Sequence, residues 1–133
     1  MATYHLQIVT PDRLVYDGQA ERIILRTVRG DACILARHID YAAPLGTGEA
    51  KVVFEDNTER IAACSGGLLS VAGGEVRVMA TTFEWEDEID LERARHAQEE
   101  AERRIASLQR TDAAYAVAEA KLKRAITRIG VKG

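Results

Sequence analysis

Glycine and proline divide this chain of 133 residues into two unlike parts. Residues 1–83 contain both prolines and most of the ten glycines, whereas residues 86–129 contain neither residue type. Glycine and proline mark turns and interrupt helices, so the first part is expected to be rich in turns and the second to be helical. We therefore predict an α+β chain with a boundary near Glu84, which separates residues 1–85 from residues 86–133.

Short runs rich in β-branched residues recur along the first part and alternate with turn signals. These signals include Asp17-Gly18, Ser65-Gly66-Gly67 and Gly73-Gly74, where glycine can supply a positive φ angle. Strands at intervals of about ten residues are typical of a small antiparallel β-sandwich or barrel. The expected strands are residues 4–9, 14–16, 22–26, 51–54, 60–64, 68–71 and 76–80.

The second part predicts an antiparallel α-helical hairpin. Asp90 is expected to cap the first helix, residues 109–112 to form a short break whose Thr111 or Asp112 caps the second helix, and Gly130 to end it. Apolar residues at three- and four-residue spacing place one face of each helix on the other. Those faces are Ala94, Ala97, Ala101, Ile105 and Leu108 in the first helix, and Ala114, Ala118, Lys121 or Leu122, Ala125 and Ile129 in the second.

Alanine dominates the expected contact between the two helices. Burial contributes roughly 0.8 kcal/mol per methylene, so alanine adds little docking energy, while its helix propensity is the highest of all residues. Such helices can persist when their contact opens, and a permanently docked pair is the alternative. The bulkier residues of the contact are expected to be Ile105, Leu108, Leu122, Ile126 and Ile129.

Charge is distributed unevenly over the second part. Residues 86–88 are all acidic, whereas the last helix is basic. The basic face is either a solvated surface or a surface for an acidic partner, and the pattern alone fits both. Its residues are Lys121, Lys123, Arg124, Arg128 and Lys132.

The overall composition excludes several classes of protein. A net charge of −3 is too small to predict binding to nucleic acid. Asp12 and Arg13 interrupt the first uncharged stretch, so neither a secretory signal nor direct membrane insertion is expected. Cys33 and Cys64 fit no metal spacing and are expected to be buried thiols in a reducing compartment, with a disulfide as the alternative.

Several segments resemble, in order along the chain, the epsilon subunit of the F-type ATP synthase, the homologue of the mitochondrial delta subunit. Residues 6–12 and 15–18 resemble the opening of that family. Residues 64–71 resemble its Ser-Gly-Gly strand turn, and Glu84 with residues 88–94 resembles the start of its C-terminal hairpin.

The resemblance implies a non-catalytic rotor subunit of the central stalk of the proton-translocating enzyme. Its sandwich would bind the gamma subunit and the c-ring, and its hairpin would reach the alpha and beta subunits, inhibiting ATP hydrolysis when extended. The subunit would lie peripherally at the cytoplasmic face of the bacterial plasma membrane. The alternative is a stand-alone ATP-sensing or adaptor domain of the same architecture.

The family's ring-facing loop usually reads Gly-Ile-Leu-Pro-x-His-x-Pro-Leu, and residues 30–41 depart from that pattern. Cys33 replaces a glycine, and Ala36 and Asp40 replace two prolines. Losing prolines leaves the unbound loop with more conformations to lose on docking. The c-ring contacts implied by the resemblance are Asp31, Arg37 and His38.

The resemblance also implies a regulatory ATP site, although no cofactor is required. Some bacterial members bind ATP through an Ile/Leu-Asp-x-x-Arg-Ala motif, which Ile89, Asp90, Arg93 and Ala94 match. The alternative is that Asp90 is only a helix cap and Arg93 only a surface charge. The remaining expected ligand contacts are Glu84, Arg124 and Arg128, and without a Walker glycine loop hydrolysis is not expected.

The chain offers weak candidates for catalysis of its own. Cys33 and His38 are five residues apart, and Ser65 lies outside a Gly-x-Ser-x-Gly elbow. No metal-binding constellation is expected around the histidines. His38 is expected to be an exposed loop contact and His96 a helix-surface residue, so the chain is not expected to be an enzyme.

Overall fold

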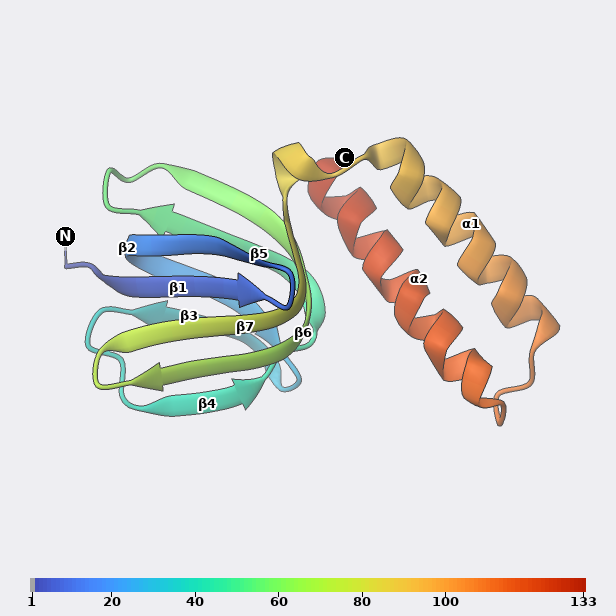
Figure 1. The fold of residues 1–133 in the computed structure, drawn as a ribbon, viewed down its shortest axis with the longest axis horizontal. Coiled ribbons are helices and arrows are strands. Elements are labelled where there is room, and N and C mark those ends of the chain that lie inside the picture. Colours follow the sequence, from blue (N-terminus) through green and yellow to red (C-terminus); the bar gives the residue numbers. More distant parts are fainter. Residues whose placement is uncertain (1) are drawn as a thin grey trace.

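Seven strands in residues 4–85 form a sheet that closes on itself, and two helices follow it (Figure 1). The computed structural model describes residues 2–133. β1 pairs with both β7 and β2, which closes the path β1–β7–β6–β5–β2 into a flattened barrel. The elements are β1 (Tyr4–Thr10), β2 (Arg13–Thr27), β3 (Gly30–Leu35), β4 (Tyr41–Pro44), β5 (Thr47–Phe54), β6 (Glu59–Ala72), β7 (Glu75–Trp85), the 3₁₀ turn η1 (Glu86–Glu88), α1 (Leu91–Ser107) and α2 (Ala113–Lys132).

Two predicted turns are wrong, because β2 and β6 continue through them. β2 passes through Asp17-Gly18 while it pairs with β1, and then pairs with β3 and β5. β6 passes through Ser65-Gly66-Gly67, where its partner changes from β5 to β4. Gly67 has a φ of +104°, and a Cβ there would lie 1.9 Å from the carbonyl oxygen of Met79. This glycine therefore permits close approach of two strands within the sheet.

The sheet also contains elements that the strand pattern did not predict. β3 and β4 were absent from the expected set; in β3, Ile34 is the one fully buried residue. β1 pairs with β7 in parallel, with Leu6 opposite Val76, whereas the other named strand pairs are antiparallel. The α+β architecture of a β-sandwich followed by a helical hairpin is confirmed.

The core of the sandwich is complete without the helices. Its fully buried side chains come from β1, β2, β3, β5, β6 and β7, and Phe83 and Trp85 meet edge to face with their ring centroids 5.0 Å apart. Cys64 lies in this core, where burial raises its pKa to about 12. Cys33 is exposed on β3, so the prediction that both thiols are buried is wrong for it; neither cysteine forms a disulfide.

The hairpin contacts the sandwich through α2, and α1 packs on the other side of α2 (Figure 1). Asp90 caps α1 as predicted, because its Oδ1 accepts the backbone N–H of Arg93 at 3.1 Å. Asp112 occupies the N-cap position of α2, but its carboxylate accepts the N–H of Gln109 instead.

α2 does not end at Gly130 but continues to Lys132. Glycine costs a helix about 1 kcal/mol relative to alanine. The next residue, Val131, offsets that cost because it is buried against Ala63 and Ile89. Ile126, which was expected in the contact between the helices, is 50% exposed.

A cluster of polar side chains joins three strands outside the core. The imidazole of His5 on β1 contacts Asp17 on β2 through Nε2 and Glu75 on β7 through Nδ1. The hydrogen bond with Asp17, and then that with Glu75, raises the pKa of His5 above its ordinary value. A raised pKa in the folded state stabilises the fold below the unfolded value of about 6.5, and this contribution is lost as the pH rises through the folded pKa.

Replacing His5 by Gln should therefore change the pH dependence of stability. The melting temperature of the wild-type chain should exceed that of His5→Gln by more at pH 6 than at pH 9. Thermal unfolding followed by circular dichroism at both pH values measures the difference. A constant gap between the two proteins would show that the cluster contributes no proton-linked stability.

Candidate functional site

A groove of about 560 Å³ lies between α1, α2 and the segment where β7 leads into η1. Its volume falls within the range of small-molecule sites, about 300–1,000 Å³. Six of the seven residues predicted to bind nucleotide line it, and Ile89 does not. The lining residues are Glu84, Glu88, Asp90, Arg93, Ala94, Ala97, Glu100, Ala101, Arg104, Ala118, Lys121, Arg124 and Arg128.

Alanine side chains create this groove. Ala94, Ala97 and Ala101 on α1 face Ala118 on α2 across it. A methyl group fills little of the space between two helices, so longer charged side chains at the rim surround a hollow. The alanine positions predicted from the helical spacing thus form the apolar wall of the candidate site.

The rim is strongly charged, with an excess of basic groups. Five basic and four acidic side chains line the groove. Within residues 2–133, four of the five basic side chains have no carboxylate partner within 4.0 Å. Guanidinium and ammonium groups without partners are suited to the oxygens of a phosphate chain. These four are Arg93, Arg104, Lys121 and Arg124.

The fifth basic residue, Arg128, already has a partner. Its Nε donates to Oε1 of Glu84 at 2.6 Å, which joins α2 to the end of β7. A ligand phosphate at Arg128 would therefore compete with Glu84 for the guanidinium. Both side chains are about one-third exposed, and pairs of this kind contribute at most about 1 kcal/mol.

Ile89 has a different position from the other motif residues. Its side chain is 4% exposed and packs with Ala63 of β6 and Val131 of α2, with Ile61 beside them. The structure therefore gives Ile89 a role in attaching the hairpin to the sandwich, outside the groove. Asp90 caps α1 and also lines the groove, so its role as a cap does not remove it from the candidate site.

Sequence reasoning did not assign Arg104, Lys121, Glu88 and Glu100 to this site. Arg104 lies eleven residues after Arg93, which is three helical turns and returns to the same face. Lys121 had been identified as part of the basic last helix and, as an alternative to Leu122, of its contact face, but not as a residue of this site. The helical spacing could have indicated these residues, but only if the helix faces that meet at the groove had already been known.

The three predicted ring-contact residues do not lie together. Arg37 and His38 belong to the connection between β3 and β4, at the end of the sandwich away from the hairpin (Figure 1), whereas Asp31 lies at the start of β3, at the opposite end of that strand. Asp31 pairs with Arg26 at 2.6 Å, and Arg37 is exposed with a φ of +66°. His38 is half-buried, not exposed as predicted, because its ring lies against Tyr41 with centroids 5.7 Å apart. The apolar side chain of Ile39 beside it is 78% exposed.

The turn before His38 has the conformation that a proline at its second position would favour. The N–H of His38 donates to the carbonyl of Leu35, and Arg37 has positive φ at the third position, as in a type II turn. Ala36 occupies the second position, which commonly holds proline in such turns. The departure from the family pattern therefore changes the freedom of the unbound loop more than its folded shape.

The described part of the chain has neither a metal-binding cluster nor a membrane-spanning helix. No cluster of three or more His, Cys, Asp or Glu side chains there is arranged to hold a metal ion. Neither helix of residues 2–133 is both long enough and apolar enough to span a bilayer. His96 lies on the surface of α1, as predicted.

Comparison with known proteins covers nearly the whole chain. A family model for the β-sandwich domain of the ATP synthase delta/epsilon chain matches residues 3–86, and one for the long α-helix domain of the same chain matches residues 87–133. The ATP synthase epsilon chain of Shouchella clausii is 42% identical over 98% of this chain and 96% of its own length. That of Halalkalibacterium halodurans is 38% identical over 100% and 99%.

Solved structures show the same arrangement of sandwich and helices. A chain in the Euglena gracilis mitochondrial ATP synthase, solved as OSCP, F1 and c-ring, superimposes with a TM-score of 0.78 at 26% identity, covering 92% of this chain and 77% of that one. A chain in the central stalk and c-ring of the Tetrahymena thermophila mitochondrial enzyme gives 0.65 at 16% identity, with 97% and 96% covered. The second likeness concerns the fold alone.

Proposed function

The chain belongs to the ATP synthase delta/epsilon family, and from this premise we propose that it is a non-catalytic central-stalk subunit of an F-type enzyme with a detachable regulatory hairpin. The observation that carries the proposal is the family match over both parts of the chain. In this role the subunit couples rotation to catalysis. The bacterial relatives support a peripheral position at the cytoplasmic face of the plasma membrane.

The sandwich is the part that binds the gamma subunit and the c-ring. Its core is closed without any contribution from the helices, so it remains a stable platform whatever the hairpin does. The related chain in the solved Euglena gracilis assembly of OSCP, F1 and c-ring supports partners in F1 and at the ring. The connection between β3 and β4, which holds Arg37 and His38, would contact the ring, and the exposed Ile39 would add apolar surface.

The hairpin is the part that opposes ATP hydrolysis, by leaving the sandwich and reaching the alpha and beta subunits. Its apolar attachment is small: Val131 of α2 packs against Ala63 and Ile89. Burial of one such side chain contributes about 1.5–3 kcal/mol. The Arg128–Glu84 pair adds little, so an undocked hairpin lies within reach of a modest change in free energy.

The charged lining of the groove supports ATP as its regulatory ligand. Arg93 and Arg124 line the groove without carboxylate partners, and they can pair with phosphate oxygens from opposite helices. Asp90 and Glu84 can accept hydrogen bonds from the base or ribose. Because both helices and β7 contribute to the groove, a ligand bound there stabilises only the docked hairpin, by about 2.7 kcal/mol at a hundredfold excess over its Kd.

Deleting residues 87–133 should relieve the inhibition of ATP hydrolysis. In the assembled enzyme the deletion is expected to raise ATP hydrolysis, because the hairpin no longer reaches the catalytic subunits. Replacing Lys121, Lys123, Arg124 and Arg128 together by Gln should act in the same direction but less strongly. Steady-state hydrolysis measures both effects.

Co-purification of the shortened chain with the gamma subunit is the control for that experiment. Residues 1–85 should retain gamma binding, since the core of the sandwich does not depend on α1 or α2. Intact assembly with an unchanged rate of ATP hydrolysis would show that the hairpin does not inhibit the enzyme. A folded sandwich that fails to bind gamma would favour a stand-alone adaptor.

Titration calorimetry of the isolated chain tests the nucleotide site. ATP should bind the wild-type chain and raise its melting temperature. Arg93→Ala should abolish both effects, because it removes a phosphate partner and leaves helix propensity almost unchanged. Arg95→Ala is the matched control, since Arg95 lies on the same helix but outside the groove. Absence of heat and of a thermal shift at millimolar ATP would rule out this site.

A further inference from the structure

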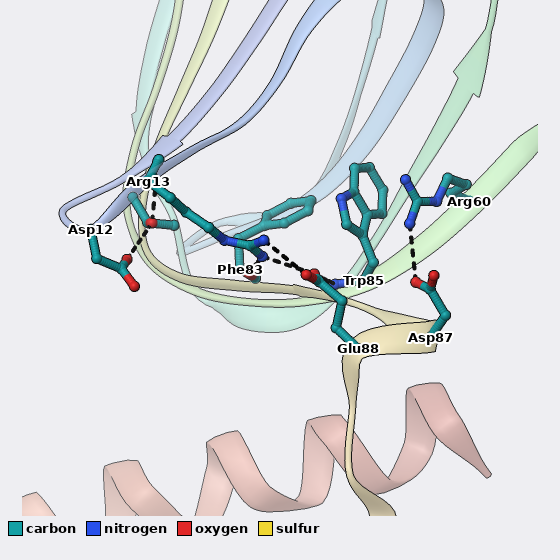
Figure 2. Close-up of polar contacts among 8 residues, drawn as sticks. Asp12, Arg13, Arg60, Phe83, Trp85, Asp87 and Glu88 are labelled. Carbon is teal, nitrogen blue, oxygen red and sulfur yellow. Dashed lines mark hydrogen bonds and ion pairs between the residues drawn. The ribbon is translucent and has the colours of Figure 1, made fainter.

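The turn η1 is fastened to the sandwich by an arginine from the other end of the sequence. Arg13, the first residue of β2, donates from Nη1 and Nη2 to the two carboxylate oxygens of Glu88, each at 2.8 Å (Figure 2). Nη2 also donates to the carbonyl of Phe83 at 3.2 Å, and Oε1 of Glu88 accepts the N–H of Trp85 at 3.0 Å. One guanidinium thus connects the β1–β2 turn, the end of β7 and η1.

A second arginine holds η1 from β6. Arg60 donates from Nη2 to Oδ1 of Asp87 at 3.0 Å, and its guanidinium lies 4.1 Å from the ring centroid of Trp85 (Figure 2). Two adjacent carboxylates of η1 are therefore bound by arginines from two different strands. Because the second contact also covers Trp85 at the edge of the core, η1 and the sandwich share one packed surface.

The β1–β2 turn that carries Arg13 is itself well fixed. Thr10 lies opposite Arg13 in the sheet, and only Pro11 and Asp12 separate them. The hydroxyl of Thr10 donates to Oδ1 of Asp12 at 2.6 Å and also lies 3.4 Å from the carbonyl oxygen of Arg13. Arg13 consequently starts from a defined backbone position when it reaches Glu88.

Immediately after η1 the polar attachments to the sandwich end: Ile89 is buried against Ala63 and Val131, and within residues 2–133 neither Ile89 nor Asp90 has a side-chain hydrogen bond or ion pair with a strand. Ile89 and Asp90 have extended backbone angles, with φ and ψ of −78° and 127° and of −90° and 106°. Asp90 is exposed, and α1 begins at Leu91 and packs on α2. Apolar packing thus holds Ile89, and the exposed Asp90 joins it to the first helix.

We propose that Arg13 is a positioning residue that, together with Arg60, makes η1 part of the sandwich, so that the hairpin pivots about Ile89 and Asp90 when it undocks. The two hydrogen bonds from one guanidinium fix the direction in which the chain leaves the sandwich. This device does not depend on nucleotide binding. The two arginine contacts determine where the hairpin starts, irrespective of the interactions that keep the hairpin docked.

The exposure of the pair shows what kind of effect to expect. The side chains of Arg13 and Glu88 are 41% and 36% exposed, and such pairs contribute little to the free energy of global unfolding. A bidentate pair nevertheless restricts the orientation of both groups. Loss of Arg13 should therefore loosen the junction locally while the melting temperature of the chain stays nearly constant.

Amide hydrogen exchange in the full chain tests the proposal. The amides of Trp85 and Ile89, which donate to Glu88 Oε1 and to the Glu86 carbonyl, report on the junction. Arg13→Met keeps the length of the side chain but removes its donors, and should speed exchange at both amides by up to about fivefold. Glu88→Gln should act alike, and the double variant should add little to either, because both remove the same contact.

Arg26→Met is the matched control. Arg26 also lies on β2 and pairs with a carboxylate, that of Asp31, at 2.6 Å, and within residues 2–133 neither side chain has a hydrogen bond or ion pair with η1. It should leave exchange at Trp85 and Ile89 unchanged. The proposal would be overturned by unchanged exchange at these amides in Arg13→Met, by an equal increase in Arg26→Met, or by an increase spread evenly over the sandwich.

Discussion

Alanine side chains form the contact between α1 and α2, and their small size determines how the hairpin can behave. Ala94, Ala101, Ala118 and Ala125 are at most 4% exposed, so the helices approach closely but bury little apolar volume. The same shortage of volume leaves the charged groove between them. Alanine has a high intrinsic helix propensity. The two helices therefore depend less on packing against the sandwich, or against each other, than helices with larger apolar faces would. Weak attachment, a ligand-sized groove and persistent helices are three consequences of one choice of residue.

The sequence predicted those parts of the fold that depend on local pattern. The glycine and proline distribution predicted the two parts, and the Asp90 cap and the alanine spacing predicted the hairpin. The failures arose where contacts distant in sequence override local preference. Gly67 serves the close approach of β7 within a continuous strand and not a turn. Gly130 is carried inside α2 because the following Val131 is buried.

The sequence could predict those residues of the candidate site that a pattern within a single helix identifies. The family motif named the residues of the first turn of α1, and the basic character of α2 pointed to its partners. The roles of the other residues required the folded chain. Ile89 matches the motif but packs beneath the hairpin, whereas Arg104 matches no motif but lines the groove. The contact between Arg13 and Glu88 joins residues 75 positions apart and has no local signal in the sequence.

The distance between sandwich and hairpin is the quantity that most directly tests the account. Spin labels at Arg77→Cys on β7 and Ala106→Cys on α1, with Cys33 and Cys64 replaced, allow it to be measured by double electron–electron resonance in the full chain. Both labelled positions are exposed. The account predicts a short and a long population without ligand, and a shift toward the short one with saturating ATP. A single short distance that ATP does not change would show that the alanine contact holds the hairpin permanently, and would contradict the account.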